Sequence, residues 1–281
     1  MENRCWWCQK ITKLTGEHFL KKTDTKDLFH EMFFSKGKNV DLIRYSGETF
    51  QIQGPNSQRL KLVPNLCAKC NGARSQSSDK SYTHFINSFK KLKNEFLDSN
   101  SIDFTKIYVG NWQIQKRNLY KYILKHACCR MSENQIVIPN AIVDFLDDRT
   151  DNCSFKIFFV SKLYDEFLMS HDIPSSYKSH LGILESPNKD PSYVVGWFTV
   201  FGLSLKYVVD LKHIKRFNND LQASKSYLTK IDYSDFNFTR EKKEGEEAKL
   251  FAELMTSLEY FPFKYENKLE LYNLLINRKS S

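Results

Sequence analysis

The sequence predicts an α+β protein whose N-terminal part is tied together by cysteines. Two Cys-x-x-Cys pairs, Cys5 with Cys8 and Cys67 with Cys70, are separated by 58 residues. Segments with alternating hydrophobic residues predict strands, and segments with hydrophobic residues every three or four positions predict helices. Both kinds of segment occur in this chain of 281 residues, which is long enough for one large domain or two smaller ones.

The composition is typical of a soluble globular protein, with 41% hydrophobic and 27% charged residues. No hydrophobic run approaches the roughly 20 residues that span a bilayer. The N-terminus lacks the hydrophobic core of a signal peptide. We therefore expect a cytoplasmic protein without membrane contact. In that compartment a Cys-x-x-Cys pair is more often a metal or redox site than half of a disulfide.

The net charge of +9 is unevenly distributed. Residues 1–85 carry 14 Lys and Arg against 8 Asp and Glu, so most of the excess lies in the part that holds the cysteines. A basic surface favours a polyanionic partner such as nucleic acid. Taken alone this signal is weak, because many basic proteins bind no nucleic acid.

Between the two cysteine pairs the sequence predicts a turn, an acid-histidine pair and β-structure. Gly16 permits a tight turn just before Glu17 and His18. Pro64 ends the β-structure, and a short helix is expected to begin near Cys67 and to include Asn71. The Ser-rich segment 75–79 then caps the next helix or links two parts of the fold. The predicted strands are 39–45, 49–53 and 59–63.

The rest of the chain predicts a mixed α+β structure. The basic residues of a helix at 115–130 predict a solvated face, with contact to nucleic acid as the alternative; they are Lys116, Arg117, Lys121 and Lys125. The adjacent Cys128 and Cys129 are expected to be buried small residues. The other predicted helices are 81–98, part of 136–148, 241–259 and 268–276. The predicted strands are 154–160, 179–184, 193–201 and 203–211, with a tight hairpin near residue 202.

The four cysteines together predict a structural zinc site. Four thiolates complete a tetrahedral Zn²⁺ site and leave no open position for catalysis. Such a site would tie the N-terminus to the helix near Cys67 and would fix the intervening loop. The paired spacing is a strong indication of zinc but a weak indication of function, because zinc ribbons occur in many proteins that are not enzymes.

The residues beside the thiols resemble the HNH endonuclease superfamily and its ββα-metal fold. The zinc-stapled branch of that family has a Cys-x-x-Cys pair, an acid-His pair, and then Asn-Leu-x-x-Cys-x-x-Cys followed by Asn or His. In this chain the matching elements occur in the same order over about residues 1–80; they are Cys5-x-x-Cys8, Glu17-His18 and Asn65-Leu66-Cys67-x-x-Cys70-Asn71.

The resemblance implies a role for each matching residue. His18 resembles the general base that activates water for attack on a phosphodiester. Glu17 and Asn71 resemble the ligands of one catalytic divalent ion, Mg²⁺ or Mn²⁺. Asn65 resembles the structural Asn that holds the His-bearing loop against the helix. Basic residues near the motif are expected to contact the nucleic-acid backbone; they are Lys21, Lys22, Lys69 and Arg74.

The chain departs from the family pattern in three ways. Asn71 stands where His is common, the insert between His18 and Asn65 is longer than a minimal hairpin, and the usual glycine pair is missing. The resemblance nevertheless predicts an HNH nuclease module at 1–85 followed by a mixed α+β domain at 86–281, which would serve target choice, dimerisation or regulation.

The predicted activity is metal-dependent hydrolysis of phosphodiester bonds in double-stranded DNA. A homodimer and a regulatory protein partner both stay open. By analogy with the family, a role in bacterial or phage defence is also open. The alternative function is a non-catalytic zinc-ribbon module that binds nucleic acid or protein. A redox protein is disfavoured, because a thioredoxin-like fold needs a single Cys-x-x-Cys pair.

Overall fold

The computed structural model divides the chain into two units, one formed by residues 1–43 and 49–235 and the other by 44–48 and 236–281. All residues described below belong to the first unit. They are 3–27, 40–43, 49–52, 54–99, 101–151, 153, 155–161, 178–185, 191–201, 203–211 and 228–233. The helices predicted at 241–259 and 268–276 lie outside the described residues.

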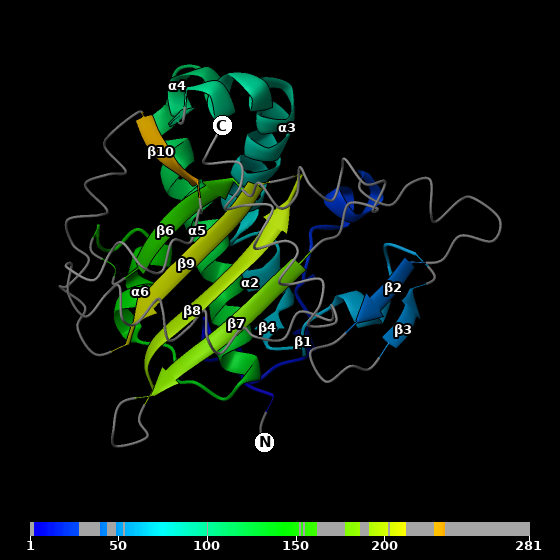
Figure 1. The fold of residues 1–281 in the computed structure, drawn as a ribbon. Coiled ribbons are helices and arrows are strands. Elements are labelled where there is room, and N and C mark those ends of the chain that lie inside the picture. Colours follow the sequence, from blue (N-terminus) through cyan, green and yellow to red (C-terminus); the bar gives the residue numbers. More distant parts are fainter. Residues whose placement is uncertain are drawn as a thin grey trace. The chain divides into compact units, whose positions relative to one another are not determined.

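A six-stranded sheet forms one layer of this unit, in the order β5-β10-β6-β9-β8-β7 (Figure 1). Only β10 and β6 run parallel, and the other described neighbours are antiparallel. The four predicted strands and the β8–β9 hairpin are confirmed, whereas β5 and β10 were not predicted. The strands are β5 (Ser101–Asp103), β6 (Phe155–Ser161), β7 (Lys178–Glu185), β8 (Pro191–Val200), β9 (Leu203–Asp210) and β10 (Leu228–Tyr233).

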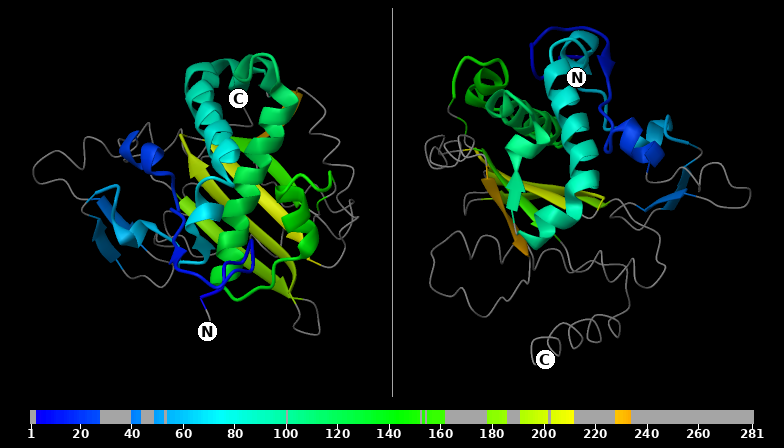
Figure 2. Two further views of the ribbon diagram at one scale, coloured as in Figure 1. Left: turned by 180° about the vertical axis from the view of Figure 1, so that it is seen from behind. Right: turned by 90° about the horizontal axis from the view of Figure 1, so that it is seen from above.

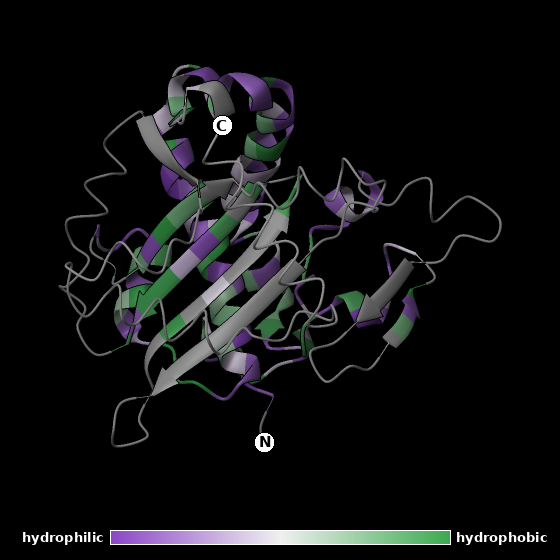
Figure 3. Cartoon of the chain, in the orientation of Figure 1, coloured by the Kyte–Doolittle hydropathy of each residue, from purple (hydrophilic) through white to green (hydrophobic). Residues whose placement is uncertain are grey.

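The helices pack on one face of this sheet, as the view from behind shows (Figure 2). Hydrophobic and hydrophilic residues follow one another along β6 and β9 (Figure 3). The Phe159 ring of β6 lies 5.8 Å from that of Phe85 and 6.0 Å from that of Phe104. These rings form the core between the two layers. The helices are α3 (Gln76–Asp98), α4 (Phe104–Ile107), α5 (Trp112–Glu133) and α6 (Asn140–Leu146).

Helix α5 is buried on all sides along most of its length, and the predicted solvated face is wrong. Every residue from 119 to 131 is buried, and so is Lys116. A buried ammonium needs a compensating charge. Lys121 pairs with Asp148, and Lys125 pairs with carboxylates of two other segments. Cys128 and Cys129 have no exposed surface, which confirms their expected burial.

The N-terminal part contains two small sheets. Strand β1 (Leu14–Thr15) pairs antiparallel with β4 (Leu66–Cys67), and β2 (Val40–Ile43) pairs antiparallel with β3 (Thr49–Ile52). Helix α2 (Ala68–Asn71) follows β4 directly, as expected. The predicted strand at 59–63 is wrong. The Ser57 hydroxyl caps a 3-10 turn, η1 (Gln58–Leu60), so only Lys61 forms a bridge, to His18.

The N-terminal part and the helical layer share one hydrophobic core. Helix α3 runs through residue 85, where the sequence predicted a domain boundary. Cys5, Leu66 and Cys70 belong to the same cluster of buried residues as Phe85 of α3 and Ile123 of α5. The predicted division at residue 85 therefore falls inside a helix that both parts would share.

The structure confirms the coarse prediction of a mixed α+β fold. Among the described residues, none of the helices combines the length and the hydrophobicity that crossing a membrane requires.

We predict that Lys116→Met stabilises the protein at low pH. The Lys116 ammonium lies 4.5 Å from the Phe104 ring centre, and burial lowers the pKa of Lys116 to about 7. The unfolded chain therefore binds more protons between about pH 7 and 10.5, so this lysine makes stability rise with pH across that range. At pH 6 the variant should gain about 1–4 kcal/mol in the free energy of unfolding.

Urea unfolding at pH 6 and pH 9 measures the effect, with Lys121→Met as the control. The gain from Lys116→Met should shrink at pH 9. Removing Lys121 would take the ammonium away from the Asp148 carboxylate, so Lys121→Met should give no gain. An equal gain from Lys116→Met at both pH values would contradict the assignment of a buried, pKa-shifted lysine.

Candidate metal centre and the adjoining polar site

The four predicted cysteines meet in one cluster that can bind a metal ion. The sulfur atoms of Cys5, Cys8, Cys67 and Cys70 all lie within 4.8 Å of one another. The Sγ atoms of Cys8 and Cys67 are 3.7 Å apart, too far for a disulfide. Four sulfurs at 2.3 Å from a tetrahedral zinc ion would lie about 3.8 Å from one another. The donor set and its spacing therefore fit zinc.

Backbone hydrogen bonds shape each of the two cysteine loops. In the first loop the amide of Cys5 donates to the Lys10 carbonyl, and the amide of Gln9, at a φ of 59°, donates to the Cys5 carbonyl. In the second loop Cys67 caps α2, and its sulfur accepts a hydrogen bond from the Cys70 amide at 3.4 Å. Burial opposes ionisation of Cys67, but hydrogen bonds from Cys70, Cys8 and Cys5 together outweigh burial and lower the pKa of Cys67 to about 7.

Arg74 lies beside the cysteine cluster. Its Nη1 atom donates to the Cys70 sulfur at 3.4 Å, and the guanidinium pairs with both Asp147 oxygens at 2.9 and 2.5 Å. The guanidinium also stacks 4.8 Å from the Trp7 ring, whose Nε1 donates to Asp147. Arg74 thus brings positive charge to a thiolate cluster and links it to the residue after α6. The sequence predicted that Arg74 contacts the nucleic-acid backbone, but in the structure its guanidinium bonds to Asp147 and Cys70.

Asn65 links the cysteine loops to each other and to α5. Its carbonyl accepts from the Trp6 amide, and its amide donates to the Thr15 carbonyl. The side-chain Nδ2 donates to the carbonyl of Cys129 at 2.6 Å. Asn65 is therefore a structural residue in this fold, although its side chain contacts α5 and not the segment that carries His18.

Glu17 forms an ion pair with a buried lysine. Its Oε2 atom lies 3.1 Å from the Nζ atom of Lys125, which also contacts Asp79 at 3.0 Å. The Lys125 side chain is only 1% exposed and that of Glu17 13%. A divalent ion bound through Glu17 would lie next to this ammonium, and like charges at short range repel. In this arrangement Glu17 does not fit the expected role of metal ligand.

His18 lies in a short antiparallel ribbon that faces residues 60–62. The Leu62 amide donates to the Glu17 carbonyl at 2.8 Å, and the Phe19 amide donates to the Leu60 carbonyl at 2.9 Å. At Gly16 a Cβ atom would overlap the Leu62 carbonyl oxygen, so the close approach requires glycine. Within the described part of the chain, the buried Nδ1 atom of His18 has no hydrogen-bond partner.

Burial lowers the pKa of His18, and the nearby charges of Lys61 and Lys22 lower it further. The imidazole is therefore neutral near pH 7 and can accept a proton.

Asn71 lies against the strand that leads to Glu17 and His18. Its Nδ2 atom donates to the Thr15 hydroxyl at 3.1 Å. Its buried Oδ1 atom has no hydrogen-bond partner among the described residues. This bond joins the end of α2 to Thr15, two positions before Glu17.

The three predicted phosphate-binding lysines differ in their surroundings. Lys21 is half-buried, and its Nζ donates to the Asp79 carbonyl and the Thr83 hydroxyl, both at 2.6 Å. Lys22 and Lys69 are exposed. Two distant residues complete the site: Lys125, which the sequence pattern assigned to a solvated helix face, and Asp147, for which the sequence predicted no role. The only sequence signal for Lys125 is its place among hydrophobic residues on every side of a helix.

Comparisons with protein-family models, with curated proteins and with solved structures give no match. The resemblance to HNH endonucleases therefore stays a prediction that rests on the motif residues.

We predict one zinc ion per chain, held by the four cysteines. Cys70→Ser should abolish stoichiometric zinc and lower thermal stability, because a structural zinc contributes directly to folding. Cys153→Ser is the matched control, since Cys153 is equally buried but lies outside the cluster. Elemental analysis of the purified proteins measures the metal content. Loss of zinc from both variants, or from neither, would contradict the assignment.

We also predict that Arg74→Gln weakens zinc binding about 10- to 100-fold, the usual effect of removing a residue that supports a metal ligand. The measurement is the rate and extent of zinc transfer to a chromogenic chelator. Arg149→Gln is the control, because Arg149 also pairs with Asp147, at 3.1 Å, and its removal leaves the Arg74–Cys70 contact in place. Equal zinc transfer from the two variants would show that the Arg74–Cys70 contact does not support the metal.

Proposed function

We propose that the N-terminal part is a zinc-stapled endonuclease module of the HNH type that hydrolyses phosphodiester bonds in double-stranded DNA. His18 is the proposed general base, and the four cysteines are the proposed ligands of a structural zinc ion. The proposal joins the motif resemblance to the contacts around β1, β4 and α2.

The observation that supports the proposal is a set of buried polar atoms without hydrogen-bond partners on the motif residues. Among the described residues these atoms include Nδ1 of His18, Oδ1 of Asn65 and Oδ1 of Asn71. Buried polar atoms without partners are rare in folded proteins and cost free energy unless a ligand or water satisfies them. Their occurrence on three motif residues, of which Asn71 donates to the hydroxyl of Thr15 three positions before His18, supports a binding site for substrate or water.

The proposed chemistry of His18 follows from its neutral imidazole. A neutral ring nitrogen can take a proton from water as that water attacks phosphorus. Glu17 and Asn71 would hold a divalent ion only after Glu17 released Lys125, and the ion would then supply positive charge beside the phosphate.

The Glu17–Lys125 ion pair favours a second candidate, a non-catalytic zinc module that binds nucleic acid. A buried ammonium at 3.1 Å satisfies the carboxylate without any metal ion. In this alternative, Glu17 has a structural role and attaches the N-terminal segment to α5.

We predict that the zinc-loaded protein cuts supercoiled plasmid DNA with added Mg²⁺ or Mn²⁺ and not without them. His18→Ala should reduce the rate by about 10²–10⁴-fold, the usual contribution of a general base. Gln58→Ala is the control, since Gln58 is an exposed residue of η1, the 3-10 turn just before Lys61, which bridges to His18. The control variant should cut at the wild-type rate.

Three results separate the two candidates. The nuclease is supported if the wild type and Gln58→Ala cut the plasmid and His18→Ala does not. Equal cutting by wild type and His18→Ala would reject His18 as the base. No cutting by a zinc-loaded wild-type protein with either ion would reject the nuclease and favour the binding module.

A further inference from the structure

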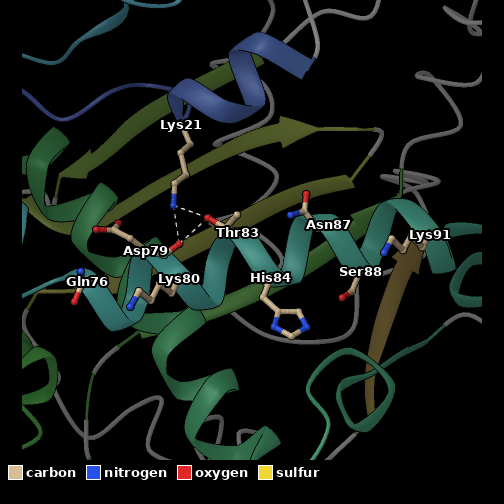
Figure 4. A pocket seen from close by; sticks show the side chains of 9 residues that line it. All are labelled: Lys21, Gln76, Asp79, Lys80, Thr83, His84, Asn87, Ser88 and Lys91. Carbon is tan, nitrogen blue, oxygen red and sulfur yellow. Dashed lines mark hydrogen bonds between the residues drawn. The ribbon is translucent and has the colours of Figure 1, made fainter.

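An open groove of about 510 Å³ runs along one face of α3 (Figure 4). The α3 residues recur at spacings of three and four positions, so they form a continuous stripe on the helix. One further residue, Lys21, reaches the groove from the N-terminal segment. The lining residues are Lys21, Gln76, Asp79, Lys80, Thr83, His84, Asn87, Ser88 and Lys91.

The groove carries an excess of positive charge. Its three lysines face a single carboxylate, that of Asp79. That carboxylate is already compensated from the interior, because its two oxygens accept from Lys125 at 3.0 Å and from the Ser75 hydroxyl at 3.0 Å. The field in the groove therefore attracts an anion.

The side chain of Lys21 is held at the wall of the groove by hydrogen bonds. Two hydrogen bonds, to the Asp79 carbonyl and the Thr83 hydroxyl, fix its ammonium at the wall of the groove. These bonds use two of the three N–H donors of the ammonium, which also lies 5.8 Å from the ring centres of Tyr82 and Tyr122. His84 is also positioned, because its ring meets the Tyr108 ring edge-on at 5.3 Å.

The remaining side chains indicate what kind of anion fits. Lys, Ser, Thr, Asn and Gln are the residue types that contact the phosphates and sugars of a duplex. Proteins that bind single strands stack bases on aromatic rings. None of the described residues that line this groove is Phe, Tyr or Trp. The lining therefore suits a nucleic-acid backbone and not exposed bases.

The groove begins beside the proposed active site. Lys21 follows His18 by three residues, and Asp79 shares the Lys125 ammonium with Glu17. From Gln76 to Lys91 the helix rises about 22 Å, at 1.5 Å per residue. That length matches roughly six base pairs of a duplex at 3.4 Å each.

We propose that this groove binds the phosphate backbone of a nucleic-acid duplex. The inference rests on the proposed function and deepens it, since it assigns the place where the substrate backbone lies next to His18. Lys80 and Lys91 make the exposed phosphate contacts, and Lys21 makes the contact nearest to the active site.

The test is the salt dependence of binding to a fluorescein-labelled DNA duplex of about 24 base pairs, followed by anisotropy between about 50 and 200 mM NaCl. The full-length, zinc-loaded chain is used without added Mg²⁺ or Mn²⁺, so that no cleavage occurs. Each phosphate contact contributes about 0.9 to the slope of log Kobs against log salt concentration. The double variant Lys80→Gln/Lys91→Gln should therefore lower the slope by about 1.8 and weaken binding.

A second double variant controls for net charge. Lys90→Gln/Lys106→Gln removes the same two charges from lysines that do not line the groove and that pair with Asp27 and Glu95. Its slope should stay close to that of the wild type. An unchanged slope in the groove variant, an equal fall in both variants, or no duplex binding by the wild type would overturn the proposal.

The result is independent of cleavage. If the protein binds the duplex through the groove but does not cut plasmid, the groove proposal is supported and the nuclease proposal is rejected. If the protein cuts plasmid but the Lys80→Gln/Lys91→Gln variant has the wild-type salt slope, the nuclease proposal is supported and the groove proposal is rejected.

Discussion

The ammonium of Lys125, buried in the middle of α5, determines how the N-terminal segment attaches to the rest of the unit. A buried charge is tolerated only when it is paired and hydrogen-bonded. Here the partners come from two other segments, Glu17 from the N-terminal ribbon and Asp79 from α3. Removing either carboxylate would leave the ammonium with half of its compensation. The ribbon that carries His18 is therefore fixed to both long helices by one charge.

The cysteine cluster is joined to the same scaffold by separate contacts. Arg74 connects Cys70 to Asp147 at the end of α6, and Asn65 connects the cysteine loops to the Cys129 carbonyl of α5. A metal ion bound by the four thiolates would therefore stabilise more than the loop between them. These ties explain why the N-terminal part and the helical layer share a single hydrophobic core, where a self-contained module at residues 1–85 would need a core of its own.

The local features of this fold could be predicted from sequence, and the pairings of charges could not. The Cys-x-x-Cys spacing by itself indicates a metal site. The β-branched and aromatic residues of β8 and β9 predict a hairpin, because the two strands are close in the chain. The lysines of α5 were assigned to solvent because charged side chains usually lie there. Their burial depends on distant partners, such as Asp79, which is 46 residues from Lys125. Arg74 was predicted to contact phosphate because it lies just after the motif, while its partner Asp147 is 73 residues away.

The charges around Glu17 bear directly on how a metal ion and a substrate could bind. Glu17, Asp79 and Asp24 lie close to Lys21 and Lys125, and burial raises the pKa of Asp24. The group therefore holds at most one net negative charge, which is less than a divalent ion needs for neutrality. A phosphate backbone in the groove along α3 would place negative charge beside Lys21. It would partly neutralise the positive charge of Lys21 and so reduce the repulsion between Lys21 and a cation near Glu17. On this electrostatic argument a divalent ion is better accommodated together with nucleic acid than before it.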